Sequence, residues 1–416
     1  IYSMMKKTVN HILAAGLLAL LSLASCTDEF IEGNDLQGVD RDKRVEVRLP
    51  FGVGRGITTT ITTRAAGGEI DYDSQLSGVM AFVYEAKSDN PEENELLAYH
   101  LFSNPSNKPL EGATGGWIAD NDDPTCGEIK FYVPVGDVYI YLLGNAQSSF
   151  LNFFPGVSGG DALGTQAEFF EKATPKWNGN IHSVDGYLPL TGMVNNNTGL
   201  CHVNEQGQIS YTDEEGKTHT LLPDGKHDED NSFVLKRLMS KITMNIREGK
   251  GVKFTARDYT VRHIPHYVSP TAQAWTEEER DRILVEDAKP VNFGLLDSLT
   301  FTIYLPENIR KVRSGVEITE YRQRDKVVKT ADNKNTEETA PDDFHADNAD
   351  NHKGHYKFEF APKASTYIEL TGWFENADKT VAADVRYYIH LGNFGKDLNH
   401  FSVERDHHYT YNVTIN

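Results

Sequence analysis

Cys26, in the segment Leu23-Ala24-Ser25-Cys26, is the residue whose neighbours most clearly specify a chemical modification. Two lysines precede an apolar run of about 13 residues, and small residues stand directly before the cysteine. This order is typical of a secretory signal, and the run is shorter than the roughly 20 residues of a membrane-spanning helix. A cysteine after Leu-Ala-Ser matches the lipobox, in which the thiol receives a diacylglycerol. We therefore predict a lipidated Cys26; the alternative is an ordinary signal peptide with an incidental cysteine.

Arg64 is the residue that best fits a site of proteolytic processing. Small residues, Ala65-Ala66-Gly67-Gly68, follow it, and the β-branched run 57–63 precedes it. Proteases cut most readily in exposed segments of this composition. We predict cleavage after Arg64, with Ala65 as the new N-terminus; an uncut surface linker is the alternative. Arg55 is the second candidate, but a cut there would leave residues 57–63 attached.

Ser158 lies in the pattern Gly156-Val157-Ser158-Gly159-Gly160, which fits the turn that presents a nucleophilic serine in some hydrolases. However, Pro155 stands where a strand should enter that turn, and no convincing His and acidic partners occur in the order such hydrolases use. A glycine-rich loop is therefore favoured over a serine nucleophile. A short helix is expected after it, because Thr165 and Glu168 form a capping box.

Cys126 and Cys201 are the two cysteines that remain beside the lipobox cysteine. No cluster of basic residues that would lower a thiol pKa lies near either one in the sequence, so we predict that they are not a catalytic pair. His202 adjoins Cys201, but neighbouring residues of a strand point to opposite faces. The sequence leaves open whether the two cysteines form a disulfide.

The acidic segment 331–355 contains His345, His352 and His355. It lacks the glycine-centred spacing of a calcium loop, and no helix sets two histidines on one face, so a solvated loop is favoured over a metal site. Three glycines between residues 52 and 56 resemble a phosphate-binding loop. The Thr-rich run after them is a poor start for the helix that such a loop needs. We therefore predict no catalytic residue, no metal and no cofactor.

The 416 residues have a formal net charge of −20. This balance argues against binding to nucleic acid, since neutralising phosphates needs clustered Lys and Arg. It suits a protein displayed outside the cell, where self-repulsion discourages nonspecific association. The length suffices for two or three domains.

Short strands dominate the sequence after the signal, beginning with the alternating pattern of residues 45–49. In residues 129–145 we expect two strands separated by a Pro-Val-Gly turn, and in residues 233–246 a strand that opens the second domain. A capping box predicts a helix from Thr276 to about Glu286. Many strands with few helices predict an all-β protein built of face-to-face sandwiches.

Changes in composition predict the domain limits. Residues 224–230 include no apolar residue, which is typical of a boundary. The predicted organisation is a lipoprotein signal peptide at 1–25, a tether at 26–44, an N-terminal β-sandwich domain at 45–228 and a C-terminal β-sandwich domain at 229–416.

Four blocks of the chain stand in a characteristic order. They are a Pro–Gly turn before a Tyr-rich strand, a strand with a basic pair, a Pro-Glu-Asn element and a Tyr-rich closing strand, at residues 133–146, 235–246, 304–310 and 387–416. Together with the lipobox, this order resembles the fimbrillin, or type V pilin, family of Bacteroidota. The resemblance implies two tandem transthyretin-like β-sandwich domains with short helices in loops, and a structural role in surface fimbriae.

In that family, an Arg-specific protease removes the first strand of lipidated precursors, and a strand from another subunit fills the groove. The resemblance implies attachment to the outer membrane through the lipid on Cys26, exposure at the cell surface, and partners that are other fimbrial subunits bound by donor-strand exchange. Cleavage after Arg64 would free residues 26–64 and open a groove in the first domain. A cut at Arg55 would let residues 57–63 refill that groove.

The sequence ends at Asn416, in the closing Tyr-rich strand, without the further segment that serves as donor in shaft pilins. The resemblance therefore implies either a truncated sequence or a tip or accessory subunit that accepts a strand and mediates adhesion to a host or bacterial surface ligand. The alternative is a non-polymerising surface lipoprotein that binds glycan or host protein. An enzyme, such as a hydrolase acting through Ser158, is the least favoured interpretation.

Overall fold

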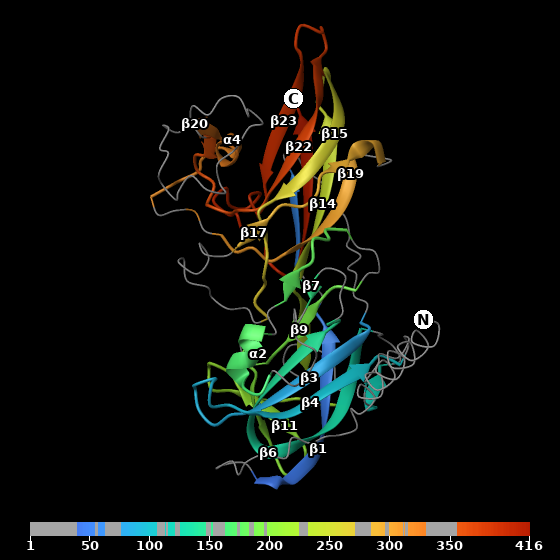
Figure 1. The fold of residues 1–416 in the computed structure, drawn as a ribbon, viewed down its shortest axis with the longest axis vertical. Helices are drawn as coiled ribbons and strands as arrows, with labels where there is room; N and C mark the ends of the chain where they lie inside the picture. The colour runs from blue at the N-terminus through green and yellow to red at the C-terminus, as the bar shows by residue number, and fades with distance from the viewer. Residues whose placement is uncertain are drawn as a thin grey trace, which may run out of the picture.

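The structure of this chain is a computed structural model whose two β units follow one another along the long axis of the molecule (Figure 1). The predicted all-β class, with short helices in loops, is confirmed. Within the described part of the chain, no helix is long and apolar enough to cross a membrane. The described residues are 40–54, 57–62, 76–105, 113, 115–120, 125–146, 151–152, 163–172, 175–182, 187–194, 198–223, 232–270, 284–295, 299–310, 312, 315–329 and 356–416.

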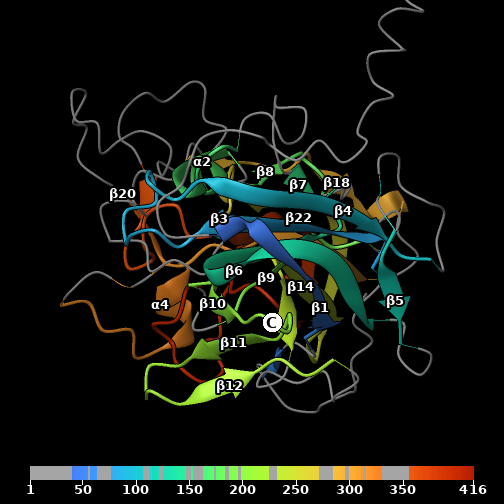
Figure 2. The same cartoon turned by 90° about the horizontal axis from the view of Figure 1, so that it is seen from below.

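The N-terminal unit is built around one ten-stranded sheet. Strand β6 pairs with five others, and the sheet curves around it, with β3 and β4 to one side and β10, β11 and β12 to the other (Figure 2). The strands are β1 (Asp40–Val53), β3 (Gly78–Glu85), β4 (Leu96–Ser103), β5 (Trp117–Ala119), β6 (Cys126–Gly144), β9 (Leu190–Gly192), β10 (Leu200–Val203), β11 (Ile209–Thr212), β12 (Thr218–Thr220) and β13 (Phe233–Arg237).

Strand β6 runs for 19 residues through the Pro-Val-Gly sequence at which a turn is predicted, so that prediction is wrong. Pro134 lies opposite Arg44, where the register of β1 shifts, and a missing N–H is tolerated at such an irregular point of a ladder. Gly136 adopts a φ of 132°, which bends the strand without ending it. As a result, the first half of β6 pairs with β1 and the second half with β3 and β10.

The C-terminal unit is a sandwich of two four-stranded sheets, with the orders β19-β14-β24-β2 and β18-β15-β22-β23. Tyr259 of β15 stacks on Phe301 of β19 with 3.9 Å between ring centroids, so the two sheets pack face to face. Their strands are β2 (Ile57–Thr62), β14 (Met239–Glu248), β15 (Val252–Arg262), β18 (Val291–Asn292), β19 (Thr300–Pro306), β22 (Tyr367–Asn376), β23 (Ala382–His390) and β24 (His407–Ile415).

The remaining elements are short and lie in the connections. The predicted capping box is confirmed: the Thr165 amide donates to Glu168 Oε2 and the Glu168 amide donates to the Thr165 hydroxyl, both at 3.2 Å. Most of the helix predicted from Thr276 lies outside the described residues. Its expected end at Glu286 is wrong, because that residue belongs to a strand paired with β16. These elements are α2 (Gln166–Lys172), η1 (Phe293–Leu295), α4 (Tyr321–Arg324), β7 (Leu151–Asn152), β8 (Lys176–Trp177), β16 (Ile264–Pro265), β17 (Val285–Glu286), β20 (Val327–Lys329) and β21 (Tyr356–Phe358).

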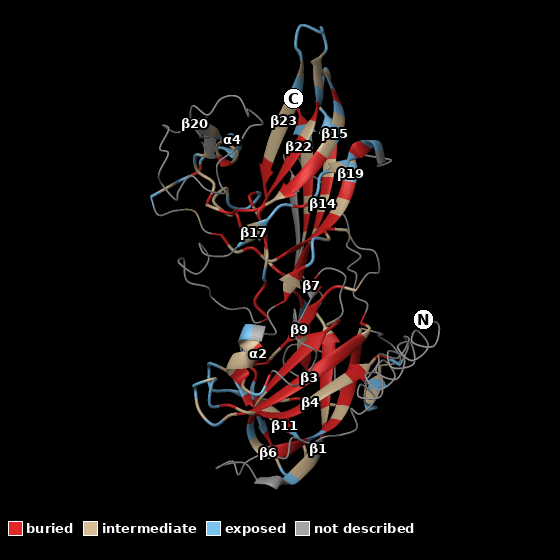
Figure 3. Ribbon diagram, in the orientation of Figure 1, coloured by how far each residue is buried: buried red, intermediate tan, exposed pale blue. Residues whose placement is uncertain are grey.

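One apolar cluster extends through both units, from Tyr141 and Phe169 to the core of the C-terminal sandwich. Figure 3 shows buried residues along the strands of both units. The segment 175–182 strengthens this contact, since the Tyr304 amide donates to the Ile181 carbonyl at 2.8 Å. The units therefore share apolar packing and are not joined by a polar linker alone.

The chain crosses between the units along two routes that run side by side. Strand β1 pairs in parallel with β13, and the strands that follow them, β2 and β14, both pair in parallel with β24. The prediction of one strand over residues 233–246 is wrong, because the chain changes sheets at Leu238. A local pattern cannot distinguish one strand from two that continue in the same direction. The predicted domain limits at 228 and 229 stay a prediction.

Candidate functional site

Residues 40–62 form the candidate functional site, because this segment supplies a strand to each unit. In β1, the side chains of Val47, Leu49 and Phe51 are fully buried and alternate with residues of the opposite face, which explains why the segment forms a strand. Burying each of these side chains stabilises the strand by about 1.5–3 kcal/mol. We call the surface that β6, β13 and Gly207 present to this strand the β1 seat.

A buried acidic group lies in the β1 seat. Glu128 of β6 is only 7% exposed, and its Oε2 accepts from Arg48 Nε at 2.8 Å and lies 2.5 Å from Arg48 Nη2. A second ion pair, Lys43 with Glu205, lies at the surface, with side chains 48% and 62% exposed. A buried charge depends on its partner far more than an exposed one does. The Arg48–Glu128 pair is therefore the polar contact that matters most in this part of the seat.

Two glycines allow the chain to approach β1 closely. At Gly207, with a φ of 75°, an added Cβ would lie 2.1 Å from the carbonyl oxygen of Glu46. At Gly127, an added Cβ would lie 2.8 Å from the Ile118 carbonyl oxygen of β5 and 3.3 Å from the ring of Phe51, which also packs edge-on against Trp117 at 4.9 Å. Side chains at these two positions would occupy space that β1 fills.

Arg237 holds the point at which β1 leaves the N-terminal unit. Its buried guanidinium donates through Nη1 to the Gly54 carbonyl at 2.9 Å and to Asp406 Oδ1 at 2.7 Å. The Gly54 amide donates to the Leu235 carbonyl at 2.9 Å, and the Asp406 amide to the Met239 carbonyl at 3.2 Å. Burial raises the pKa of Asp406, against the opposing effect of the Arg237 charge. Three segments that are distant in sequence therefore meet at one guanidinium.

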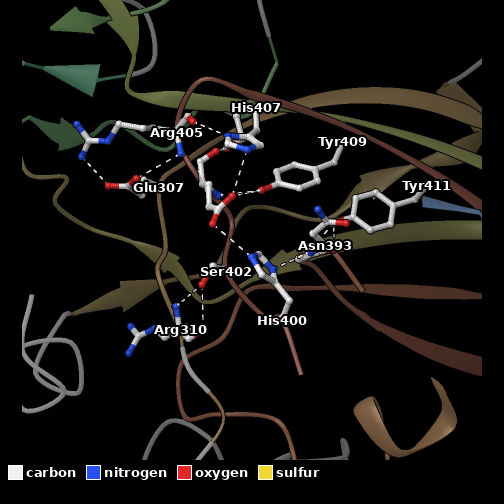
Figure 4. Close-up of polar contacts among 12 residues, drawn as sticks. Glu307, Arg310, Asn393, His400, Ser402, Arg405, His407, Tyr409 and Tyr411 are labelled. Atoms are coloured by element: carbon white, nitrogen blue, oxygen red, sulfur yellow. Dashed lines mark hydrogen bonds and ion pairs between the residues drawn. The ribbon is translucent and has the colours of Figure 1, made fainter. Parts of the chain in front are cut away.

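The second strand of the segment, β2, pairs over six positions with β24, which begins at His407. A polar cluster holds the turn before β24: His400 and His407 lie on the two oxygens of Glu404, at 3.3 and 3.1 Å, and Arg405 binds Glu307 at 2.5 Å (Figure 4). The hydrogen bond from His400 lowers the pKa of Glu404, which keeps this carboxylate ionised. The strand on which β2 lies is thus fixed at its start by charged contacts.

The residues predicted from the sequence for lipidation and processing, Cys26, Arg64 and Ala65, lie outside the described residues, as do Arg55 and Ser158. Their roles stay predictions. The three histidines of the segment 331–355 also lie outside the described part of the chain. Among the residues that are described, no group of three or more His, Cys, Asp or Glu could hold a metal ion.

Cys126 and Cys201 are both buried, and no disulfide joins them. Burial raises the pKa of the Cys201 thiol, so the reactive thiolate is disfavoured there. His202 points to the opposite face of β10, as expected for a strand neighbour, and its Nδ1 lies 2.8 Å from Asp137 Oδ1. The side chains of Cys201 and His202 are not brought together.

The placement of β2 corrects the expected effect of a cut. Residues 57–62 pair with β24 in the C-terminal unit, so a cut after Arg64 would free strands from both units and not from the first alone. The expectation that residues 57–63 would refill the groove after a cut at Arg55 is wrong for the same reason. Residues 57–62 belong to another sheet.

Three residues of the site were not predicted from the sequence: Glu128, Gly207 and Arg237. One signal was available for Arg237, because it continues the alternation of Phe233 and Leu235 and so occupies a position that faces the core. A charged residue at such a position indicates a buried polar contact. For Glu128 and Gly207, the importance of each residue depends on β1, which is distant in sequence.

The chain is similar to known proteins in part of its sequence and in its fold. A family model described as a domain of unknown function, DUF4906, matches residues 303–413. The structure is similar to the tip fimbrial protein Mfa3 from Porphyromonas gingivalis, with 13% identity, a TM-score of 0.42 and coverage of 90% of this chain and 95% of that chain. The chain resembles fimbrial and cell-adhesion proteins. No curated protein matches it.

Two further solved structures are similar in fold to this chain. One is a candidate cell adhesion protein from Parabacteroides distasonis, with 10% identity, a TM-score of 0.42 and coverage of 88% of both chains. The other is a candidate adhesin from Bacteroides ovatus, with 8% identity, a TM-score of 0.31 and coverage of 90% of this chain and 88% of that chain. At these identities the similarity concerns the fold.

The contact of Gly207 with β1 gives a first prediction. In Gly207→Ala the new Cβ must displace the Glu46 carbonyl, so we expect faster amide hydrogen exchange in residues 45–53. Gly216→Ala is the matched control, because Gly216 also has a positive φ, of 80°, but nothing lies within 4 Å of an added Cβ. Both variants strain the backbone by about 1–2 kcal/mol, so exchange in β1 that rises equally in both would contradict the proposed contact.

A second prediction concerns the buried charge of Arg237. Arg237→Leu removes the countercharge of Asp406 and the donor to the Gly54 carbonyl, and we expect the free energy of unfolding to fall by about 3–5 kcal/mol. Arg257→Leu is the control, since Arg257 pairs with Asp384 at the surface and its loss costs less than about 1 kcal/mol. Urea denaturation measures both. A loss at Arg237 no larger than at Arg257 would show that the buried contact does not hold the units.

Proposed function

We propose that this chain is a structural subunit of surface fimbriae, made as a lipoprotein precursor and assembled by protease-triggered strand exchange. In this proposal it is a tip or accessory subunit that mediates adhesion. Its partners are other fimbrial subunits, and the lipid on Cys26 holds the precursor in the outer membrane, facing the cell exterior. The sequence blocks at residues 133–146 and 387–416 support the class of protein.

The observation that carries the proposal is that one N-terminal segment completes a sheet in each unit. Strand β1 fills a seat lined by fully buried apolar side chains, and β2 is the last strand of its sheet. Both can leave without breaking other pairings, because β13 stays paired with β9, and β24 with β14. An incoming strand would recover backbone hydrogen bonds and apolar burial together.

The alternative is a non-polymerising surface lipoprotein that binds glycan or host protein. Trp373 of β22 favours it, because this large aromatic side chain is 41% exposed and stands opposite Asp384. An exposed ring beside a carboxylate suits contact with a sugar. This function requires no cut after Arg64, so the state of the mature N-terminus distinguishes the two proposals.

The processing step is tested by treating the purified chain with an Arg-specific protease and sequencing the product. We expect a new N-terminus at Ala65, because the linker after β2 consists of small residues. Arg64→Ala should block this cleavage, whereas Arg55→Ala should leave it unchanged. A surface-assembled protein that still begins at lipidated Cys26 would rule out cleavage after Arg64.

The anchoring step is tested by metabolic labelling with a fatty acid in cells that make the full chain. Wild type should incorporate the label and Cys26→Ala should not, because the thiol of Cys26 is the proposed acceptor. Cys201→Ser is the control and should be labelled as wild type, since that thiol is buried. Equal labelling of wild type and Cys26→Ala would contradict lipidation at this residue.

A further inference from the structure

The β1 seat contains two buried charged groups in addition to its apolar lining. Glu128 receives the guanidinium of Arg48, and Arg237 donates to the carbonyl of Gly54. Both partners on β1 would leave with the strand if it were removed. Apolar pockets accept many side chains of suitable size, whereas buried charges discriminate strongly between partners. The two charged groups therefore restrict the sequences of strands that can replace β1.

At Glu128, an incoming strand must replace the positive charge of Arg48. The Glu128 carboxylate is 7% exposed, whereas the Arg48 side chain is 34% exposed and reaches it from the partly exposed face of the strand, where Lys130 stands opposite Arg48 on β6. A neutral side chain in place of Arg48 would leave the carboxylate without this guanidinium, and an acidic one would add repulsion. The site selects for a cationic residue.

At Arg237, an incoming strand must place a backbone carbonyl where the Gly54 carbonyl accepts its hydrogen bond. Little space remains there for a side chain. An added Cβ at Gly54 would lie 3.1 Å from Val234 Cγ1 and 3.5 Å from Asp406 Oδ2. The Gly54 amide also donates to the Leu235 carbonyl, so both backbone groups of this residue are used. A glycine fits this position without displacing a neighbour, whereas a larger residue would press against the Val234 side chain.

We propose that Glu128 and Arg237 select the incoming strand, which must have a cationic residue six positions before a glycine, with apolar residues alternating between them. This inference rests on the strand exchange proposed above. On β1 the two positions are Arg48 and Gly54, and the apolar residues between them are Leu49, Phe51 and Val53. The partner is thus an extended segment of another subunit with this pattern, which runs in the same direction as β1.

The test uses the full chain with a site for a sequence-specific protease inserted after Gly67. After cleavage, the freed segment is displaced by an excess of a fluorescent peptide that comprises residues 40–62, and binding is followed by anisotropy. Peptides with Arg48→Glu, Gly54→Val or Lys43→Glu are compared with the wild-type peptide. Lys43→Glu is the matched control, because it reverses a charge on the same strand at an exposed ion pair.

We expect Arg48→Glu and Gly54→Val to weaken binding of the peptide at least about tenfold, since each disturbs a buried polar contact. Lys43→Glu should weaken it less than about fivefold. A chain with Glu128→Arg should restore binding of the Arg48→Glu peptide. The four peptides are compared on the unchanged chain, so that comparison does not depend on whether the Glu128→Arg chain folds.

The outcomes separate the two proposals. Equal binding of all four peptides would overturn selection by Glu128 and Arg237 and leave strand exchange intact. A wild-type peptide that never displaces the cleaved segment would overturn strand exchange itself, and the selection with it. Loss of binding with Lys43→Glu as large as with Arg48→Glu would show a general charge effect and would also overturn the inference.

Discussion

The buried guanidinium of Arg237 is the interaction on which the arrangement of the two units depends. It joins the end of β1, through the carbonyl of Gly54, to the turn before β24, through Asp406. Removing one member of a buried ion pair costs more than the pair contributes, because the remaining charge is left in a poorly solvated place. The crossings from β1 to β2 and from β13 to β14 are therefore held in one register.

This register makes the N-terminal segment part of both units. Strand β2 is the last strand of its sheet, and β1 meets β13 only at its final residues. The shared apolar cluster, by contrast, lies in strands that pair with one another independently of the segment.

Apolar and charged contacts have different roles in the β1 seat. The buried side chains of Val47, Leu49 and Phe51 supply most of the free energy that holds the strand, and any strand with the same alternation would supply it too. Glu128 and Arg237 add little net stability, since burying a charge is costly. What they add is a requirement for a residue of a given charge at a given position of the strand, which apolar contacts do not impose.

The sequence by itself determined the class of the fold and several local elements. Alternating residues predicted strands, Thr165 and Glu168 predicted the start of a helix, and the lipobox predicted Cys26 as a modification site, because each signal is complete within a few residues. The β-branched composition of residues 57–62 is typical of a strand, and these residues form β2. Composition does not indicate the sheet that β2 joins, since pairing with β24 joins residues more than 300 positions apart in the chain.

Only the tertiary structure decided which strands meet and what lies between them. Pro134 does not end β6, because it falls at an irregular point of the ladder with β1, and Leu238 divides two strands that a local pattern joins. Glu128 and Gly207 matter through their contacts with β1, whose position no local pattern contains. Charge and close approach act between neighbours in space, and these neighbours are brought together only by the pairing of distant strands in the folded sheet.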